Sequence, residues 1–184
     1  MIYGAKRPDG VRLGDFKFTA EEAQEIRQLG AHYDAYDPDL RAFRDRGGKM
    51  IVWEGAADPS SGPYATLHYY QAVRDLLGGT AKTRDTMRVF MLPGVYHCRG
   101  GSMPYEANFL GAIVNWVEAG VAPDSVTAAA VKPDGGVRTR PIYAYPVRAQ
   151  YTGKGSIDDA ANFRGVAPAN DPDDRYPWIG ANTK

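Results

Sequence analysis

Two short apolar runs, at residues 49–53 and 87–92, place the strongest constraint on the fold of this chain. Together they contain Val, Ile, Leu, Met and aromatic residues with little polar alternation, which is typical of strands buried on both faces of a parallel sheet. Between them, residues 64–77 repeat apolar side chains every three or four positions, the spacing of an amphipathic helix. A strand, a helix and a second strand in this order predict parallel pairing through a right-handed crossover. The sequence therefore indicates an α/β fold.

Glycine and proline bound the remaining predicted elements, and the chain contains 21 Gly and 13 Pro. Helices are predicted at residues 19–29, 39–45 and 105–119, an edge strand at 126–131, a turn at 132–136, and extended chain interrupted by Pro141 and Pro146 at 137–149. The irregular segments concentrate at the two ends of the chain.

The length of 184 residues suits one domain rather than two. We expect an N-terminal extension with one helix at residues 1–33, the α/β region at 34–166, and a loosely ordered tail at 167–184.

Charge and hydropathy argue against nucleic acid and membranes as partners. Lys and Arg number 22, as do Asp and Glu, so the formal net charge is zero and no global field attracts polyanions. Tyrosines and arginines interleave at residues 138–151, as on surfaces that stack bases, but the zero net charge disfavours that interpretation. No run approaches the roughly 20 apolar residues of a membrane span. Residues 1–14 do not resemble a signal peptide.

Two titratable residues follow the two predicted strands at matching positions. Asp58 comes five residues after the first strand and His97 five residues after the second. Active sites of open α/β sheets lie at the carboxyl ends of the strands, and adjacent parallel strands are about 4.8 Å apart. We therefore expect the side chains to meet. An aspartate that accepts the ring N–H of a histidine fixes its tautomer, so the histidine acts as a general base near neutral pH.

Structural roles remain open for the same residues. An aspartate before proline at a strand end is a common turn former or helix cap, and a histidine after Pro-Gly is often an ordinary loop residue. His32 and His68 are expected to be structural or solvated, because one lies in a polar linker and the other within a predicted helix.

The sequence lacks the nucleophile that would complete a Ser-His-Asp triad. Hydrolases on α/β sheets carry this serine on a G-x-S-x-G turn that precedes the acid and the histidine. Residues 1–57 contain no serine, and none of the later serines lies in such a turn. Cys98 is a poor substitute, because adjacent side chains on extended backbone point apart. As the single cysteine, it is open to three interpretations: a buried apolar residue, a nucleophile, or half of a disulfide whose partner lies elsewhere.

No cofactor or metal is expected. The chain has no P-loop, no dinucleotide-binding glycine fingerprint and no zinc signature. The pair Asp158-Asp159 lacks the ligand spacing of a calcium loop, so a solvated face or a helix cap is the expected role.

Four stretches in the same order resemble the tannase and feruloyl esterase family, α/β-hydrolases that cleave esters of aromatic acids. They are the lead-in DPDLRAFRDRGGK at 37–49, the loop GAADP at 55–59, the loop PGVYHC at 93–98 followed by Gly100-Gly101, and the C-terminal segments RTRP at 138–141 and SIDDAANF at 156–163. The resemblance covers residues 34–166 and identifies them with the C-terminal part of the α/β-hydrolase domain.

This resemblance implies a role for each candidate residue. Asp58 matches the triad acid, His97 the triad base, and Cys98 the cysteine that bonds a second cysteine directly before the nucleophilic serine. The serine, that cysteine and the lid domain with its calcium site would belong to an upstream part. The family thus implies a carboxylic ester hydrolase for aromatic-acid esters, represented here by its acid and base and inactive alone. Relatives are usually secreted or periplasmic, but no signal in this sequence assigns a compartment.

Three departures accompany the resemblance. Tyr143 and Gly165 stand where relatives commonly carry a cysteine pair, and Glu54 stands where they often place a histidine. A truncated or degenerate domain with a structural or binding role is therefore the alternative. In either case a sheet without its first strands exposes an apolar edge, so we expect poor solubility or self-association.

Overall fold

The computed structural model describes residue 14 and residues 17–172, and it divides the chain into two compact units. One unit comprises residues 1–37 and 177–184, the other residues 38–176. In the first unit, helix α1 (Ala20–Tyr33) begins where predicted, because the Thr19 hydroxyl accepts a hydrogen bond from the N–H of Glu22. The predicted end at Gly30 is wrong. A glycine inside a helix costs only about 1 kcal/mol, and the N–H of Asp34 bonds the Gly30 carbonyl to close a further turn.

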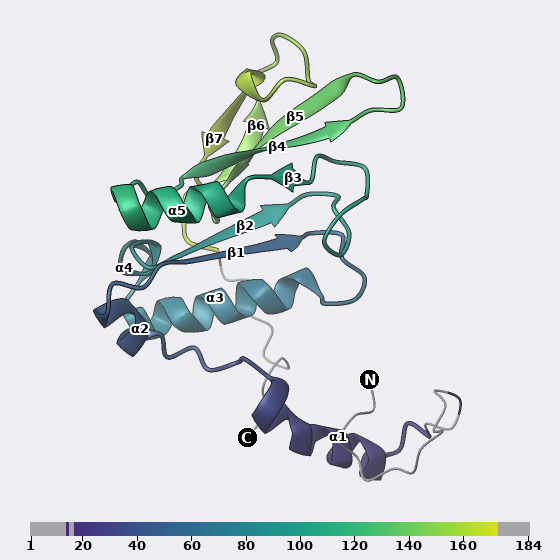
Figure 1. Ribbon diagram of the computed structural model, residues 1–184, viewed down its shortest axis with the longest axis vertical. Helices are drawn as coiled ribbons and strands as arrows, with labels where there is room; N and C mark the ends of the chain where they lie inside the picture. The colour runs from purple at the N-terminus through teal and green to yellow at the C-terminus, as the bar shows by residue number, and fades with distance from the viewer. Residues whose placement is uncertain (1–13, 15–16, 173–184) are drawn as a thin grey trace. The chain divides into compact units, whose positions relative to one another are not determined.

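The second unit is built on a parallel pair of strands, as the sequence predicts. Strand β1 (Met50–Gly55) pairs with β2 (Met87–Leu92) in a register that runs from Met50 opposite Met87 to Gly55 opposite Leu92. Helix α3 (Pro63–Leu77) forms the crossover, and the short helix α2 (Arg41–Asp45) precedes β1 (Figure 1). A five-residue helix that the sequence did not predict, α4 (Thr80–Arg84), follows α3.

Both faces of the parallel pair are covered, which explains its continuous apolar runs. On one face, Met87 and Val89 pack against α3 through Tyr70 and Val73. On the other, Phe90 and Leu92 form a second core with residues of the antiparallel strands, and Phe109 of α5 (Phe109–Ala119) packs against it. Figure 1 shows α3 and α5 on opposite sides of β1 and β2. The two cores together hold the carboxyl ends of both strands in place.

Two predictions for the chain after β2 are wrong. The segment predicted as a helix from residue 105 begins as strand β3 (Glu106–Ala107), and α5 starts only after Asn108, whose side chain accepts the N–H of Gly111 as an N-cap. The predicted edge strand is β4 (Ser125–Val131), which lies in the middle of a three-stranded sheet. It is central because β3 and β5 (Val137–Tyr143) pair with its two edges.

The C-terminal part of this unit is extended chain, as expected, but it is more regular than the sequence predicts. The turn at residues 132–136 closes with a hydrogen bond from the N–H of Lys132 to the carbonyl of Gly136. After β5 follow β6 (Arg148–Tyr151), the 3₁₀ turn Ala160–Asn162 and β7 (Phe163–Val166), with β6 and β7 antiparallel.

The described part of the C-terminal tail contacts the crossover. Asp171 accepts a hydrogen bond from the Thr80 hydroxyl at 2.5 Å, and the Pro172 carbonyl accepts one from the Gln71 amide at 3.2 Å. Residues 173–184 and most of the N-terminal extension before residue 17 lie outside the described residues. Within the described residues, no helix combines the length and the apolar character needed to cross a membrane.

Tyr143 and Gly165 are neighbours in space. A Cβ atom built on Gly165 would lie 2.7 Å from the nearest atom of the Tyr143 ring, well inside van der Waals contact. The ring of Tyr143 on β5 therefore fills the space that a side chain at Gly165 on β7 would need.

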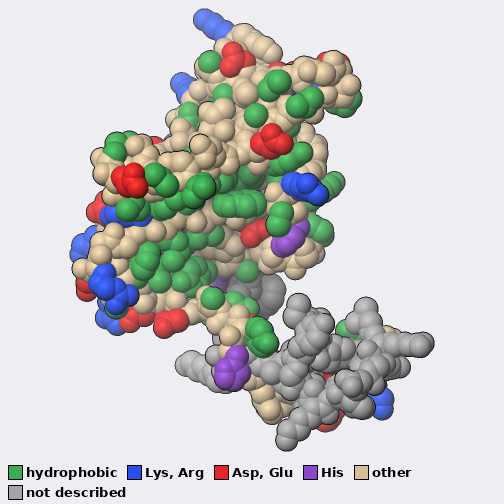
Figure 2. Space-filling model, viewed as in Figure 1, with side chains coloured by type: hydrophobic (Ala, Val, Ile, Leu, Met, Phe, Trp, Pro, Cys, Tyr) green, Lys and Arg blue, Asp and Glu red, His purple; other side chains and the backbone are tan. Residues whose placement is uncertain are grey.

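An apolar surface lies along α5 and β1. The exposed fraction is 75% for Leu110, 63% for Val117 and 39% for Trp53. Figure 2 shows hydrophobic side chains gathered over these elements. Among the described residues β1 pairs only with β2, so its other edge also carries unpaired backbone groups.

We predict that the protein self-associates through this surface. The apparent mass should rise with concentration, and the double substitution Leu110→Lys/Val117→Lys should lower it by placing charges on the exposed side of α5. Size-exclusion chromatography with light scattering across a tenfold or wider concentration series measures the effect. A monodisperse monomer throughout that series would contradict the prediction.

Candidate active site

The loops after β1 and β2 run side by side because the parallel ladder continues past the ends of the strands. The N–H of Ala56 bonds the Leu92 carbonyl at 2.9 Å, and the N–H of Ala57 bonds the Val95 carbonyl at 3.0 Å. The chain therefore delivers the segment before Asp58 and the segment before His97 to the same edge of the sheet.

Glycine makes this close approach possible. A Cβ atom on Gly55 would lie 2.5 Å from the carbonyl oxygen of Val95 and 2.4 Å from that of Tyr96. The second loop folds back on itself through a bridge between Val95 and Gly101, where a Cβ atom would lie 2.0 Å from the carbonyl oxygen of Gly94. Only residues without a side chain fit at these two positions.

The structure brings together the two side chains that the sequence singles out. The Nδ1 atom of His97 lies 2.7 Å from Oδ2 of Asp58, which is hydrogen-bond distance. The Asp58 side chain is 1% exposed, whereas that of His97 is 63% exposed. With the carboxylate ionised, Nδ1–H donates to it, and the other ring nitrogen, Nε2, carries a free lone pair. The arrangement is a buried acid that orients an accessible imidazole.

Two serines hold Asp58 in its ionised form. Ser60 donates both its N–H and its hydroxyl to Oδ1, each at 2.7 Å, and the Ser61 hydroxyl donates to Oδ2 at 2.6 Å. The hydroxyl of Ser61, followed by that of Ser60, lowers the pKa of Asp58 far below its ordinary value of 3.8, against the opposing effect of burial. The hydrogen bonds therefore favour the charged form of this carboxylate.

Glu54 lies beside the same loop. Its carboxylate lies 3.0 Å from the Ser61 hydroxyl and 3.3 Å from that of Thr66. A serine hydroxyl has one proton, so Ser61 can donate to only one carboxylate at a time. The Ser61 hydroxyl lies closer to Asp58, at 2.6 Å, than to Glu54, at 3.0 Å, so we assign its proton to the hydrogen bond with Asp58.

Cys98 is free and exposed beside His97. Its backbone has φ +63°, in the left-handed region that residues with a Cβ atom seldom adopt. The exposure of Cys98 excludes the first of the three interpretations of its thiol, that of a buried apolar residue.

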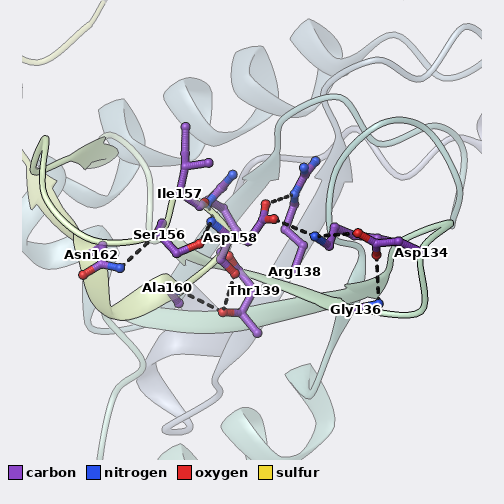
Figure 3. A network of polar contacts seen from close by, with 11 residues as sticks. Asp134, Gly136, Arg138, Thr139, Ser156, Ile157, Asp158, Ala160 and Asn162 are labelled. Carbon is purple, nitrogen blue, oxygen red and sulfur yellow. Dashed lines mark hydrogen bonds and ion pairs between the residues drawn. The ribbon is translucent and has the colours of Figure 1, made fainter.

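The remaining candidates lie elsewhere. His68 is on α3, and His32 is on α1 in the other unit. Asp158 pairs with Lys132 and Arg138 (Figure 3). Asp159 caps the 3₁₀ turn before β7. The part of the chain that the structure describes contains no group of three His, Cys, Asp or Glu side chains placed to hold a metal ion.

Solved structures with a similar fold define the class of protein. An esterase from Aspergillus oryzae aligns with a TM-score of 0.73 and 27% identity, over 82% of this chain and 34% of its own. Feruloyl esterase B from the same organism aligns with a TM-score of 0.71 and 27% identity, over 82% of this chain and 33% of its own. These neighbours are esterases of the α/β-hydrolase type.

Sequence comparison narrows the class to a family. The family model "Tannase and feruloyl esterase" matches residues 11–166, so the chain belongs to this family. Mono(2-hydroxyethyl) terephthalate hydrolase from Piscinibacter sakaiensis is 40% identical over 85% of this chain and 26% of its own length. Feruloyl esterase C from Talaromyces stipitatus is 32% identical over 73% of this chain and 29% of its own length. The chain thus spans between a quarter and a third of these relatives.

Substituting Gly55→Ala should separate the two loops. The added methyl group would collide with backbone atoms that cannot rotate away, so we expect the free energy of unfolding to fall by about 1–3 kcal/mol. The His97 ring resonances should shift as its hydrogen bond to Asp58 lengthens. Urea denaturation and NMR measure the two effects.

Gly136→Ala is the matched control, because its new methyl group meets only the flexible side chains of Lys132 and Asp134. Equal stability loss in the two variants would show that the close approach at Gly55 is not special.

The pH dependence of stability should depend on Asp58. A carboxyl group whose pKa falls on folding stabilises the protein above its unfolded pKa, and this contribution is lost as the pH falls toward the folded value. We expect Asp58→Asn to be less stable than the wild type at pH 7, with the difference shrinking as the pH falls below about 4. Urea unfolding from pH 7 to pH 3 tests this.

Ser61→Ala provides the comparison for that series, since it removes the strongest influence on the Asp58 pKa. Its pH-dependent stability should lie between those of the wild type and Asp58→Asn. A wild-type advantage that stays constant or grows toward low pH would contradict the assignment.

Proposed function

We propose that this chain supplies the acid and the base of a serine-type carboxylic ester hydrolase that acts on esters of aromatic acids. The observation that carries the proposal is the 2.7 Å contact between the buried Asp58 carboxylate and the accessible His97 imidazole, at the carboxyl ends of two parallel strands. Membership of the tannase and feruloyl esterase family supports the choice of ester chemistry.

In the proposed reaction, Nε2 of His97 removes the proton from a serine hydroxyl while the serine oxygen attacks the ester carbonyl. The positive charge that forms on the imidazole lies against the ionised Asp58 and is stabilised by it. His97 then returns the proton to the leaving alcohol oxygen, and an acyl-serine remains. Water, deprotonated by the same nitrogen, releases the aromatic acid and restores the serine.

The nucleophile of this reaction lies outside the described residues. Ser60 and Ser61 are next to the dyad, but their hydroxyl groups donate to Asp58. No serine hydroxyl in the described part of the chain forms a hydrogen bond with His97. Because the chain spans at most about a third of its relatives, we assign the serine to a segment that corresponds to their upstream part.

Cys98 fits a covalent link to that segment. It is exposed and adjoins the base in sequence, so a disulfide there would hold a nucleophile-bearing segment against His97. A disulfide between the parts would also limit their separation in the unfolded state and so stabilise the assembly by about 2–4 kcal/mol.

A chimera tests the proposed function. Residues 38–166 replace the matching C-terminal stretch of the terephthalate ester hydrolase from Piscinibacter sakaiensis, whose own upstream part remains. We expect hydrolysis of an aromatic ester such as methyl ferulate or that enzyme's named substrate, and a loss of at least a thousandfold in kcat for His97→Ala. Release of the aromatic acid measured by chromatography gives the rate.

His68→Ala is the matched control for the chimera and should retain most of the activity, since this histidine lies on α3 and is not part of the Asp58–His97 pair. The unfused chain should hydrolyse methyl ferulate no faster than its Asp58→Ala/His97→Ala variant. A folded but inactive chimera, or activity that does not depend on His97, would favour the alternative of a non-enzymatic domain.

A further inference from the structure

A cavity of about 630 Å³ lies in the second unit and adjoins the two loops of the dyad at Ala56 and Pro93. Its volume is within the range of small-molecule sites, about 300–1,000 Å³. Neither Asp58 nor His97 lines it. Its wall is mainly apolar and aromatic and is formed by the start of α3, the end of β2 and strands β5 to β7, with Tyr64, Met91, Met103, Tyr143, Tyr145 and Phe163 among the lining residues.

A buried arginine also lines this cavity. Arg140 is 8% exposed, and its guanidinium lies over the ring of Phe163 at 4.2 Å. One nitrogen, Nη1, donates to the backbone carbonyls of Thr139 and Ile157. In the described residues, the remaining N–H groups on Nε and Nη2 form no hydrogen bond, and no carboxylate pairs with this arginine.

The neighbouring acid is already neutralised. Asp158 lies 3.0 Å from the Lys132 ammonium and 2.5 Å from Nε of Arg138 (Figure 3). Lys132 also pairs with Asp134 at 3.2 Å, so the two carboxylates of this cluster are balanced by its two cations. Arg148, which also lines the cavity and is exposed, forms no ion pair among the described residues. The cavity therefore contains an excess of positive charge.

A charge that is partly withdrawn from water is unfavourable unless an opposite charge compensates for it. Burial, and then the charge of Arg138, lower the pKa of Arg140 against the opposing charge of Asp158. An anion in the cavity would offset this cost through charge-assisted hydrogen bonds to the unused N–H groups. The cavity is larger than a small inorganic anion. Its wall is aromatic, which favours a ligand with a ring.

We propose that this cavity binds an aromatic carboxylate, with the carboxylate on Arg140 and the ring among the tyrosine, methionine and phenylalanine side chains. Arginine suits this role because its planar N–H groups match the two oxygens of a carboxylate. Neither dyad side chain lines the cavity, so the proposal does not depend on whether the chain takes part in ester hydrolysis.

Calorimetric titration of the full chain with ferulate tests the proposal. We expect saturable binding of one ferulate, at least tenfold weaker binding of methyl ferulate, which lacks the charge, and no comparable binding of inorganic phosphate. Arg140→Gln should weaken ferulate binding at least tenfold. Arg164→Gln is the matched control, because this exposed arginine of β7 bonds Gln150 and does not line the cavity.

Ala149→Trp tests the site without removing a charge. Ala149 lines the cavity and is exposed, so a large side chain there should occupy part of the volume and weaken ferulate binding without disturbing the core. This variant decides the question if circular dichroism shows that Arg140→Gln is unfolded.

The Asp58→Ala/His97→Ala variant separates this site from the dyad, and it should bind ferulate as the wild type does. The proposal is overturned by any of three results: equal affinity for ferulate and its methyl ester, unchanged ferulate binding in folded Arg140→Gln and Ala149→Trp, or loss of binding in the dyad variant alone.

Discussion

Hydrogen bonding between β1 and β2 continues beyond the strands themselves, through the N–H groups of Ala56 and Ala57, and the candidate site depends on that continuation. A parallel ladder aligns two loops that are 39 residues apart in sequence and directs them toward the same edge. Gly55 removes the one side chain that would separate them. Strand pairing, not loop sequence, thus sets the distance between Asp58 and His97.

The dyad is asymmetric in its exposure, and this asymmetry suits acid–base chemistry. Asp58 is buried among hydroxyl and N–H donors that favour its charged form, so its role is fixed. The imidazole of His97 extends from that buried anchor toward solvent, where a reacting group can reach Nε2. A buried carboxylate in a satisfied network costs the fold little, while the residue that we propose exchanges protons remains accessible.

The sequence was sufficient to predict the elements with a local repeat of apolar residues and the site residues whose positions follow from strand topology. Continuous apolar runs revealed β1 and β2, and counting from their ends located Asp58 and His97. The central position of β4 was not predictable, because it results from pairing with the two residues of β3, which have no periodicity of their own. The four-residue pattern Asp-Pro-Ser-Ser was a usable signal for the serines that bond Asp58, since serine side chains and N–H groups after an aspartate often bond its carboxylate in turns.

The packing of the Tyr143 ring against Gly165 restricts the order in which these two positions can change during evolution. A cysteine introduced first at 165 would meet the ring, whereas one introduced first at 143 would only leave a gap beside the glycine. A cysteine pair at these two positions would therefore require position 143 to change before position 165. A side chain at position 165 fits only after the Tyr143 ring has been replaced by a smaller residue.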